Sequence, residues 1–186
     1  MENKTYSWCN GAGTWDEPYI IENVTINANS NNFGILINNS NNIYFKIRNC
    51  TIFNSALGNL NAGIRLENSD NGTLINNTCS DNNENGILML NCVNITITDN
   101  TIENNTQYGV YINDSNCENI NIYNNRFIQN GINGRDDSDL DKNNWNSSLI
   151  GNYWHNYSGS DADDNNIGDS AYNDIAGSAG RSEERL

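Results

Sequence analysis

Hydrophobic and polar residues alternate in short runs along the middle of the chain, and these runs recur at a regular spacing. Each run starts with Gly, carries apolar residues one and three positions later, and reaches Ser or Cys six positions after the glycine. The four copies begin at Gly34, Gly63, Gly86 and Gly109. Alternation with a period of two predicts β-strands, and repetition every 20–50 residues or so predicts a solenoid.

A second repeated segment follows each of these runs, so the copies can be aligned along their full length. Stacking the aligned copies predicts three columns of residues that lie above one another. The columns are Asn77, Asn100 and Asn125 above Cys50; Ser40, Ser69, Cys92 and Ser115; and Ile52, Cys79, Ile102 and Phe127.

The fold class follows from how such short strands bury their apolar side chains. One coil of three- to five-residue strands cannot bury them alone, but coils stacked about 4.8 Å apart form a continuous core. We therefore predict an all-β, right-handed parallel β-helix with capped ends. An antiparallel meander is the alternative. The inward residues are expected to include Ile64, Leu66, Ile87, Met89, Val110 and Ile112.

The chain divides into three predicted regions. Residues 1–18 are expected to form an N-terminal cap, in which Trp8 and Trp15 cover the first coil because an open solenoid end exposes its core. Residues 19–131 form the coils. Residues 132–186 form a C-terminal cap with an acidic loop and an open tail that ends as if cut from a longer chain.

Two of these regions depart from the regular repeat. Residues 53–62 make one coil longer than the next two, and such loops are where solenoids commonly carry binding sites. After Gly131 the repeat pattern is expected to break. The aromatic cluster expected to close the far end consists of Trp145, Tyr153, Trp154 and Tyr157.

The composition and net charge limit the classes of binding partner. Hydrophobic residues make up only 36% of the 186 residues, and the deficit is filled by Asn, which adopts left-handed turns and suits the corners of a coil. The net charge of −14 argues against nucleic acid and anionic membranes and favours divalent cations. No run is apolar enough to insert into a membrane. We expect an extracellular or cell-surface location, with the targeting segment missing from this sequence.

The five cysteines do not form a zinc motif, because no Cys-x-x-Cys pair is present. Cys50, Cys79 and Cys92 fall on interior columns and are predicted to be buried as small apolar residues. Cys92 and Cys117 lie in neighbouring coils, and whether they form a disulfide is left open.

Motifs near the C-terminus carry a family resemblance. These motifs are Asn143-Asn144-Trp145, Gly151-Asn152-Tyr153-Trp154, Asp161-Ala162-Asp163 and Ile167-Gly168-Asp169. Together with the coils, over about residues 11–180, they resemble the NosD-type subgroup of pectin-lyase-like right-handed parallel β-helix proteins. The resemblance implies a secreted or cell-surface protein.

The copper role in the name of that subgroup is not transferred to this chain. A copper site needs clustered His, Met or Cys ligands. The sequence contains one histidine, His155, and two methionines, Met1 and Met89, of which Met89 is on an inward column.

The strongest candidate metal site is the acidic loop. Side-chain oxygens come from Asp161, Asp163, Asn165 and Asp169, and Ile167 could add its carbonyl oxygen. Oxygen ligands at alternate positions of a tight loop suit Ca²⁺. The loop departs from the EF-hand pattern, so a further ligand must come from elsewhere or from water. A solvated acidic loop is the alternative.

A second acidic run has the same alternate spacing. It comprises Asp137, Asp139 and Asp141, and it lacks a following glycine. We interpret this run as solvated carboxylates rather than as a metal site.

No catalytic residues are predicted. Along the outward positions of the glycine-initiated strands only Arg65 and Glu67 are charged, and the paired carboxylates of a glycosidase are missing. The sequence therefore predicts a non-catalytic, calcium-binding surface module with a structural or adhesive role, whose partners could include glycans or other cell-surface proteins. The alternative is a carbohydrate-binding or polysaccharide-cleaving β-helix protein.

Overall fold

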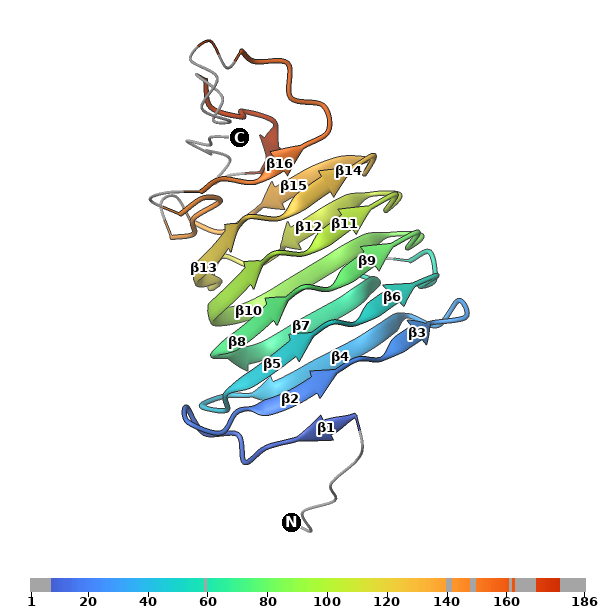
Figure 1. The fold of residues 1–186 in the computed structure, drawn as a ribbon, viewed down its shortest axis with the longest axis vertical. Helices are drawn as coiled ribbons and strands as arrows, with labels where there is room; N and C mark the ends of the chain where they lie inside the picture. The colour runs from blue at the N-terminus through green and yellow to red at the C-terminus, as the bar shows by residue number, and fades with distance from the viewer. Residues whose placement is uncertain are drawn as a thin grey trace.

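The computed structural model describes residues 8–58, 60–139, 142–147, 150–160, 162 and 170–177. Within these ranges the chain forms seventeen strands and no helix. The strands stack as successive coils from the N-terminal end to the C-terminal end of one elongated solenoid (Figure 1). All strand pairs are parallel except the first, so the predicted parallel β-helix is confirmed and the antiparallel meander is excluded.

The coils have three faces, each a ladder of parallel strands. The first face contains β2 (Tyr19–Glu22), β5 (Phe45–Arg48), β8 (Gly72–Ile75), the second half of β10 (Asn85–Thr98) and β13 (Glu118–Tyr123). The second contains β3 (Thr25–Asn27), β6 (Thr51–Phe53), β9 (Thr78–Ser80), β11 (Thr101–Glu103), β14 (Arg126–Ile128) and β16 (Tyr153–Trp154). The third contains β4 (Phe33–Ser40), β7 (Ala62–Asp70), the first half of β10, β12 (Tyr108–Ile112), β15 (Ile132–Asp136) and β17 (Ile175–Ala176).

The inward residues of the three faces form one core. On the third face, Ile64, Ile87 and Val110 stack in register and are fully buried, as predicted. The predicted column on the second face is also confirmed. In chain order it contains Ile52, Cys79, Ile102 and Phe127.

A ladder of buried asparagines runs up the corner between the first and second faces. The Oδ1 atom of Asn100 accepts hydrogen bonds from the backbone N of Asn77 at 2.9 Å and from its Nδ2 at 3.0 Å. Its own Nδ2 donates to the carbonyls of Leu74 and Thr98, both at 2.9 Å. The same pattern confirms the predicted column and extends it by one residue, giving Cys50, Asn77, Asn100, Asn125 and Asn152.

A second ladder, which the sequence interpretation missed, follows the strands of the second face. The Oδ1 atom of Asn105 accepts from the backbone N of Asn82 at 3.2 Å and from its Nδ2 at 2.9 Å. In the same way, the Oδ1 of Asn130 accepts hydrogen bonds from the backbone N and the Nδ2 of Asn105. The Oδ1 of Asn82 accepts one from the backbone N of Ser55. The spacing of 23 and 25 residues between these asparagines was visible in the sequence.

The corners of the coils confirm the role expected for asparagine. Of the nineteen described non-glycine residues with positive φ, fourteen are Asn. Asn favours this left-handed region because its short polar side chain bonds to the local backbone. One corner stack of such residues comprises Asn23, Asn49, Asn76, Asp99 and Asn124.

The apolar pattern breaks after Gly131 as predicted, but the prediction that the coils end there is wrong, because the parallel stacking continues. In β15, Gly134 lies above Val110 and Asp136 lies above Ile112. The apolar alternation disappears there since Trp145 fills the interior: a Cβ at residue 134 would lie 2.6 Å from its ring. Asp136 is buried and accepts hydrogen bonds from the Trp145 Nε1, at 3.3 Å, and from Ser138.

The predicted position of Ser115 is also wrong. The register pairs Val93 with Glu118, and the backbone N of Cys92 lies 3.4 Å from the Sγ of Cys117. Cys117 therefore takes the place above Cys92. Two extra residues in this turn move Ser115 out of the column, where it is exposed.

The two ends are closed differently. At the N-terminal end β1 (Cys9–Asn10) pairs antiparallel with β2. The expectation that Trp8 and Trp15 cover the first coil is wrong, because their side chains are 44% and 76% exposed.

At the C-terminal end the predicted aromatic closure holds for three of the four residues. Trp145 and Trp154 are buried, and Tyr157 packs against the core, whereas Tyr153 faces outward. The ring of Trp154 stacks on Phe127 at 4.4 Å on one side and on Tyr172 at 4.2 Å on the other. Tyr172 is the member that the sequence interpretation did not place in this cluster.

We expect Asn100→Ala to lower the free energy of unfolding by about 2–4 kcal/mol, because it leaves several buried donors and acceptors of the ladder unpaired. Urea denaturation followed by circular dichroism measures this change. The matched control is Asn116→Ala, an exposed asparagine outside both ladders. Equal effects of the two substitutions would mean that the ladder contributes nothing beyond an ordinary surface amide.

Candidate functional site: a polar pocket on the third face

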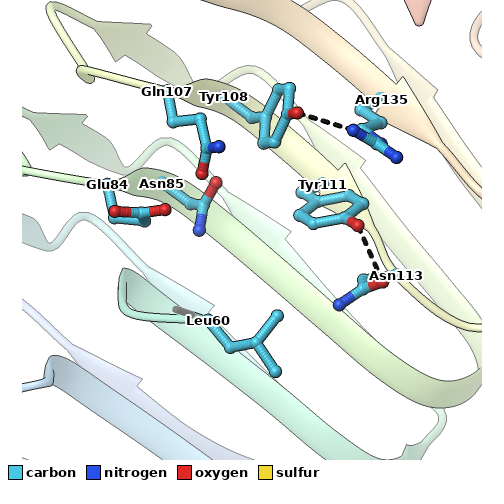
Figure 2. A pocket seen from close by; sticks show the side chains of 8 residues that line it. All are labelled: Leu60, Glu84, Asn85, Gln107, Tyr108, Tyr111, Asn113 and Arg135. Carbon is cyan, nitrogen blue, oxygen red and sulfur yellow. Dashed lines mark hydrogen bonds between the residues drawn. The ribbon is translucent and has the colours of Figure 1, made fainter. Parts of the chain in front are cut away.

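A pocket of about 390 Å³ lies on the outer surface of the third face (Figure 2). Strands β10, β12 and β15 and the loop before β7 supply its walls. The lining residues are Leu60, Glu84, Asn85, Gln107, Tyr108, Tyr111, Asn113 and Arg135.

In-register stacking places the central residues of the pocket side by side. Tyr111 of β12 lies between Leu88 of β10 and Arg135 of β15. Leu88 is on the outward side of its strand and yet is 0% exposed, so other side chains cover it. Arg65, the next residue in this ladder, donates from Nη1 to the carbonyl of Leu60 at 3.0 Å. This bond holds the long loop at Leu60, which lines the pocket.

Arg135 organises one end of the pocket. Its Nη1 donates to the Tyr108 hydroxyl at 2.7 Å, and its Nε donates to Oδ2 of Asp137 at 2.8 Å. Its guanidinium carbon lies 5.4 Å from the ring centre of Tyr108 and 5.2 Å from that of Tyr111. These contacts hold both rings in place and raise the pKa of Arg135, chiefly through the bond to Asp137.

The hydroxyl of Tyr111 has two acceptors within reach. They are Oδ1 of Asn113 at 2.7 Å and Oδ2 of Asp137 at 2.8 Å (the first bond is drawn in Figure 2). Partial burial, together with the hydrogen bond to Asp137, raises the pKa of Tyr111 to about 12. The phenol therefore stays protonated and serves as a donor across the physiological range.

The other end of the pocket is rich in acceptors. Glu84 is 8% exposed, and its Oε2 accepts from the backbone N of Gly58 at 3.4 Å. Asn85 is 1% exposed and donates from Nδ2 to the carbonyl of Asn61 at 2.7 Å, but its Oδ1 has no hydrogen-bond partner in the part of the chain that the structure describes. Gln107 lies beside both in Figure 2.

The residues predicted to bind calcium lie outside the described residues. They are Asp161, Asp163, Asn165, Ile167 and Asp169. Over the part of the chain that the structure describes, no group of three or more His, Cys, Asp or Glu side chains could hold a metal ion.

The second acidic run behaves differently at each position. Asp137 was predicted to be solvated, but it is partly buried and bonded to Arg135 and Tyr111. Asp139 is exposed as expected and forms an ion pair with Lys142 at 3.0 Å. Asp141 lies outside the described residues.

The charges predicted along the outward strip, Arg65 and Glu67, form an ion pair with each other at 2.8 Å. The sequence interpretation missed the pair formed by Arg135 and Asp137 because it ended the coils at residue 131. Extending the repeat by one coil would have placed Arg135 next to Tyr111.

Comparison with models of known families shows the family to which the chain belongs. The family model described as "Periplasmic copper-binding protein (NosD)" matches residues 5–159. The chain belongs to the NosD family. Among curated proteins, no significant match is found. The NosD description is that of a binding protein and not of an enzyme, in agreement with the prediction from sequence, and its periplasmic location agrees with a place outside the cytoplasm.

The described residues do not fit a copper centre. Met89 is buried in the apolar core and His155 is exposed at the far end of the solenoid. Burial raises the pKa of the Cys50 and Cys79 thiols, which disfavours the thiolates that soft metals require.

In the described ranges there is no helix long and apolar enough to cross a membrane.

We predict that Asp137→Asn lowers the pKa of Tyr111 toward the ordinary tyrosine value of about 10, because it removes the acceptor charge that favours the protonated phenol. Absorbance titration of phenolate in Asp137→Asn, with the same titration in Tyr111→Phe subtracted, isolates this group.

The sign of the stability effect follows from the raised pKa. The stabilisation from this phenol is complete below the ordinary tyrosine pKa and is lost as the pH rises through about 12. The assigned cause would be contradicted if the phenol that titrates at high pH is absent from Tyr111→Phe but keeps the same pKa in Asp137→Asn.

Proposed function

We propose that this NosD-family chain is a non-catalytic β-helix of the cell envelope or cell surface that binds saccharides in the pocket on its third face. The observation that carries the proposal is the combination of Tyr108 and Tyr111 with planar polar side chains around one concave site. A structural or adhesive role would follow from such binding.

The chemistry of the pocket matches that of a sugar ring. A sugar has an apolar C–H face, which packs on aromatic rings, and a hydroxyl rim, which exchanges hydrogen bonds with amides and carboxylates. Tyr111 supplies the ring, while Asn85, Gln107 and Asn113 supply amides. Because Arg135 already fixes both tyrosine rings, little side-chain entropy is lost when a ligand binds.

The charges on this face support binding rather than cleavage. Asp137 is paired with Arg135, and Glu67 is paired with Arg65. A glycosidase needs two carboxylates free to act as acid and as base or nucleophile. These ion pairs leave that requirement unmet at both positions, so we propose no catalytic residue.

We expect wild-type protein to bind at least one soluble oligosaccharide from a panel of glucose, mannose and N-acetylglucosamine oligomers without cleaving it. Tyr111→Ala should weaken that binding about tenfold or more, since it removes the aromatic wall. Isothermal titration calorimetry measures the affinity, and chromatography of the recovered oligosaccharide detects cleavage.

Tyr153→Ala is the matched control, because Tyr153 is an exposed aromatic residue on the second face. Binding that survives Tyr111→Ala, or that is lost equally in Tyr153→Ala, would show that the pocket is not the site. Turnover of the bound sugar would overturn the non-catalytic assignment.

Calcium binding by Asp161, Asp163, Asn165 and Asp169, with the carbonyl of Ile167, is a separate proposal that comes from the sequence. The anchoring of the chain on both sides of this loop supports it. Tyr157 packs against the core and donates its hydroxyl proton to the carbonyl of Ser170 at 2.7 Å, and Tyr172 stacks on Trp154. An ion held in the loop would therefore tie two anchored segments together.

We expect Ca²⁺ at a hundredfold excess over its dissociation constant to stabilise the folded chain by about 2.7 kcal/mol, which raises the melting temperature by several degrees. Thermal melts with EDTA and with CaCl₂ measure the shift. Asp163→Asn/Asp169→Asn should abolish it, whereas Asp16→Asn/Glu118→Gln, which removes the same charge at exposed positions, should retain it. No shift in wild type would mean a solvated loop.

A further inference from the structure

We infer that the acceptor-rich end of the third-face pocket selects a saccharide that carries a free amino group. This inference rests on the proposed saccharide binding and names the class of sugar. Two neighbouring residues of β10 and the turn before it, Glu84 and Asn85, carry it.

The first observation is an unused acceptor. Asn85 is almost completely buried, and its Nδ2 is committed to the carbonyl of Asn61 at 2.7 Å. That bond fixes the amide so that Oδ1 is the free end, and within the described ranges this oxygen has no hydrogen-bond partner. A buried polar atom without a partner costs about 1–3 kcal/mol. A ligand that donates a hydrogen bond here removes that cost.

The second observation is a buried carboxylate without a cation. The ion pairs of the described residues engage Glu22, Glu67, Asp137 and Asp139, but not Glu84. Among the described residues, the side chain of Glu84 accepts one hydrogen bond, from the backbone N–H of Gly58 at 3.4 Å. Removing a carboxylate from water is costly unless charge or several hydrogen bonds compensate it.

The nearest cation in the pocket does not supply that compensation. The guanidinium of Arg135 lies at the opposite end, where it is paired with Asp137 and bonded to Tyr108. Figure 2 shows Glu84 and Asn85 on one side of the pocket and Arg135 on the other. One end is therefore neutralised, while the other keeps a negative charge within a chain whose net charge is −14.

An ammonium group fits this end better than a hydroxyl group or a carboxylate. It brings a positive charge for Glu84 and three donors, of which one can reach Oδ1 of Asn85 and another the amide oxygen of Gln107. A hydroxyl offers one donor and no charge, and a uronate would be repelled. The sugar ring attached to the ammonium would then extend toward Tyr111.

The test compares three oligomers of similar length: glucosamine, N-acetylglucosamine and galacturonic acid. Titrations are run slightly below neutral pH, where the glucosamine nitrogen is protonated. We expect glucosamine oligomers to bind wild type at least tenfold more tightly than N-acetylglucosamine oligomers, with galacturonate oligomers weakest. Glu84→Gln should remove this preference while leaving the weaker binding of N-acetylglucosamine oligomers.

A matched variant separates the site from the general acidity of the chain. Glu118→Gln removes one negative charge from an exposed position of β13 and should keep the preference. Because Glu84 is buried and its replacement could impair folding, Gln107→Glu provides a second measurement. Gln107 is exposed, and a carboxylate there should increase the preference for glucosamine several-fold.

The outcomes distinguish the inference from the function on which it rests. Equal affinity for amino and N-acetylated sugars, with both lost in Tyr111→Ala, overturns the inference and leaves saccharide binding in place. A preference that persists in Glu84→Gln, falls equally in Glu118→Gln, or is unchanged by Gln107→Glu also overturns it. Absence of binding to every oligosaccharide overturns the proposed function, and the inference with it.

Discussion

The structure depends on hydrogen bonds that join the buried corner asparagines of one coil to those of the next. Two asparagine ladders provide these bonds. In them the Oδ1 atoms of Asn100 and Asn105 each accept both the backbone N–H and the side-chain N–H of the asparagine below. A misplaced coil would break these bonds along the whole column. The ladders therefore fix the register of each coil on the next, and this register also aligns the apolar columns.

Fixed register also determines the outer surface. Since identical positions of successive coils lie about 4.8 Å apart, outward side chains of neighbouring coils must contact one another. On the third face this brings Arg135 over the rings of Tyr108 and Tyr111 and covers Leu88. The pocket is thus a product of stacking, with the loop at Leu60, held by Arg65, as its added wall.

Membership of the NosD family accounts for the fold of this chain better than for its ligand. The description of the family names copper, whereas most thiols and the thioether of the described residues are buried in the core as packing groups. The polar chemistry lies on the outer face and is built from oxygen and nitrogen groups of tyrosine, arginine, amide and carboxylate side chains. Oxygen and nitrogen groups of this kind form hydrogen bonds with hydroxyl and ammonium groups. They are not the soft sulfur ligands that copper prefers.

The sequence by itself determined the repeat, the strand alternation, the apolar columns and the asparagine column at Asn100. These features recur at a regular spacing that can be read from the sequence without knowing which residues are in contact. It could not determine where the coils end. Gly134 and Asp136 break the apolar pattern, and only the tertiary structure supplies the Trp145 ring that fills the space and donates to the carboxylate. The pocket was hidden for the same reason, because its ion pair lies in that last coil. That Glu84 forms none of the ion pairs of the described residues likewise becomes visible only when its neighbours in space are known.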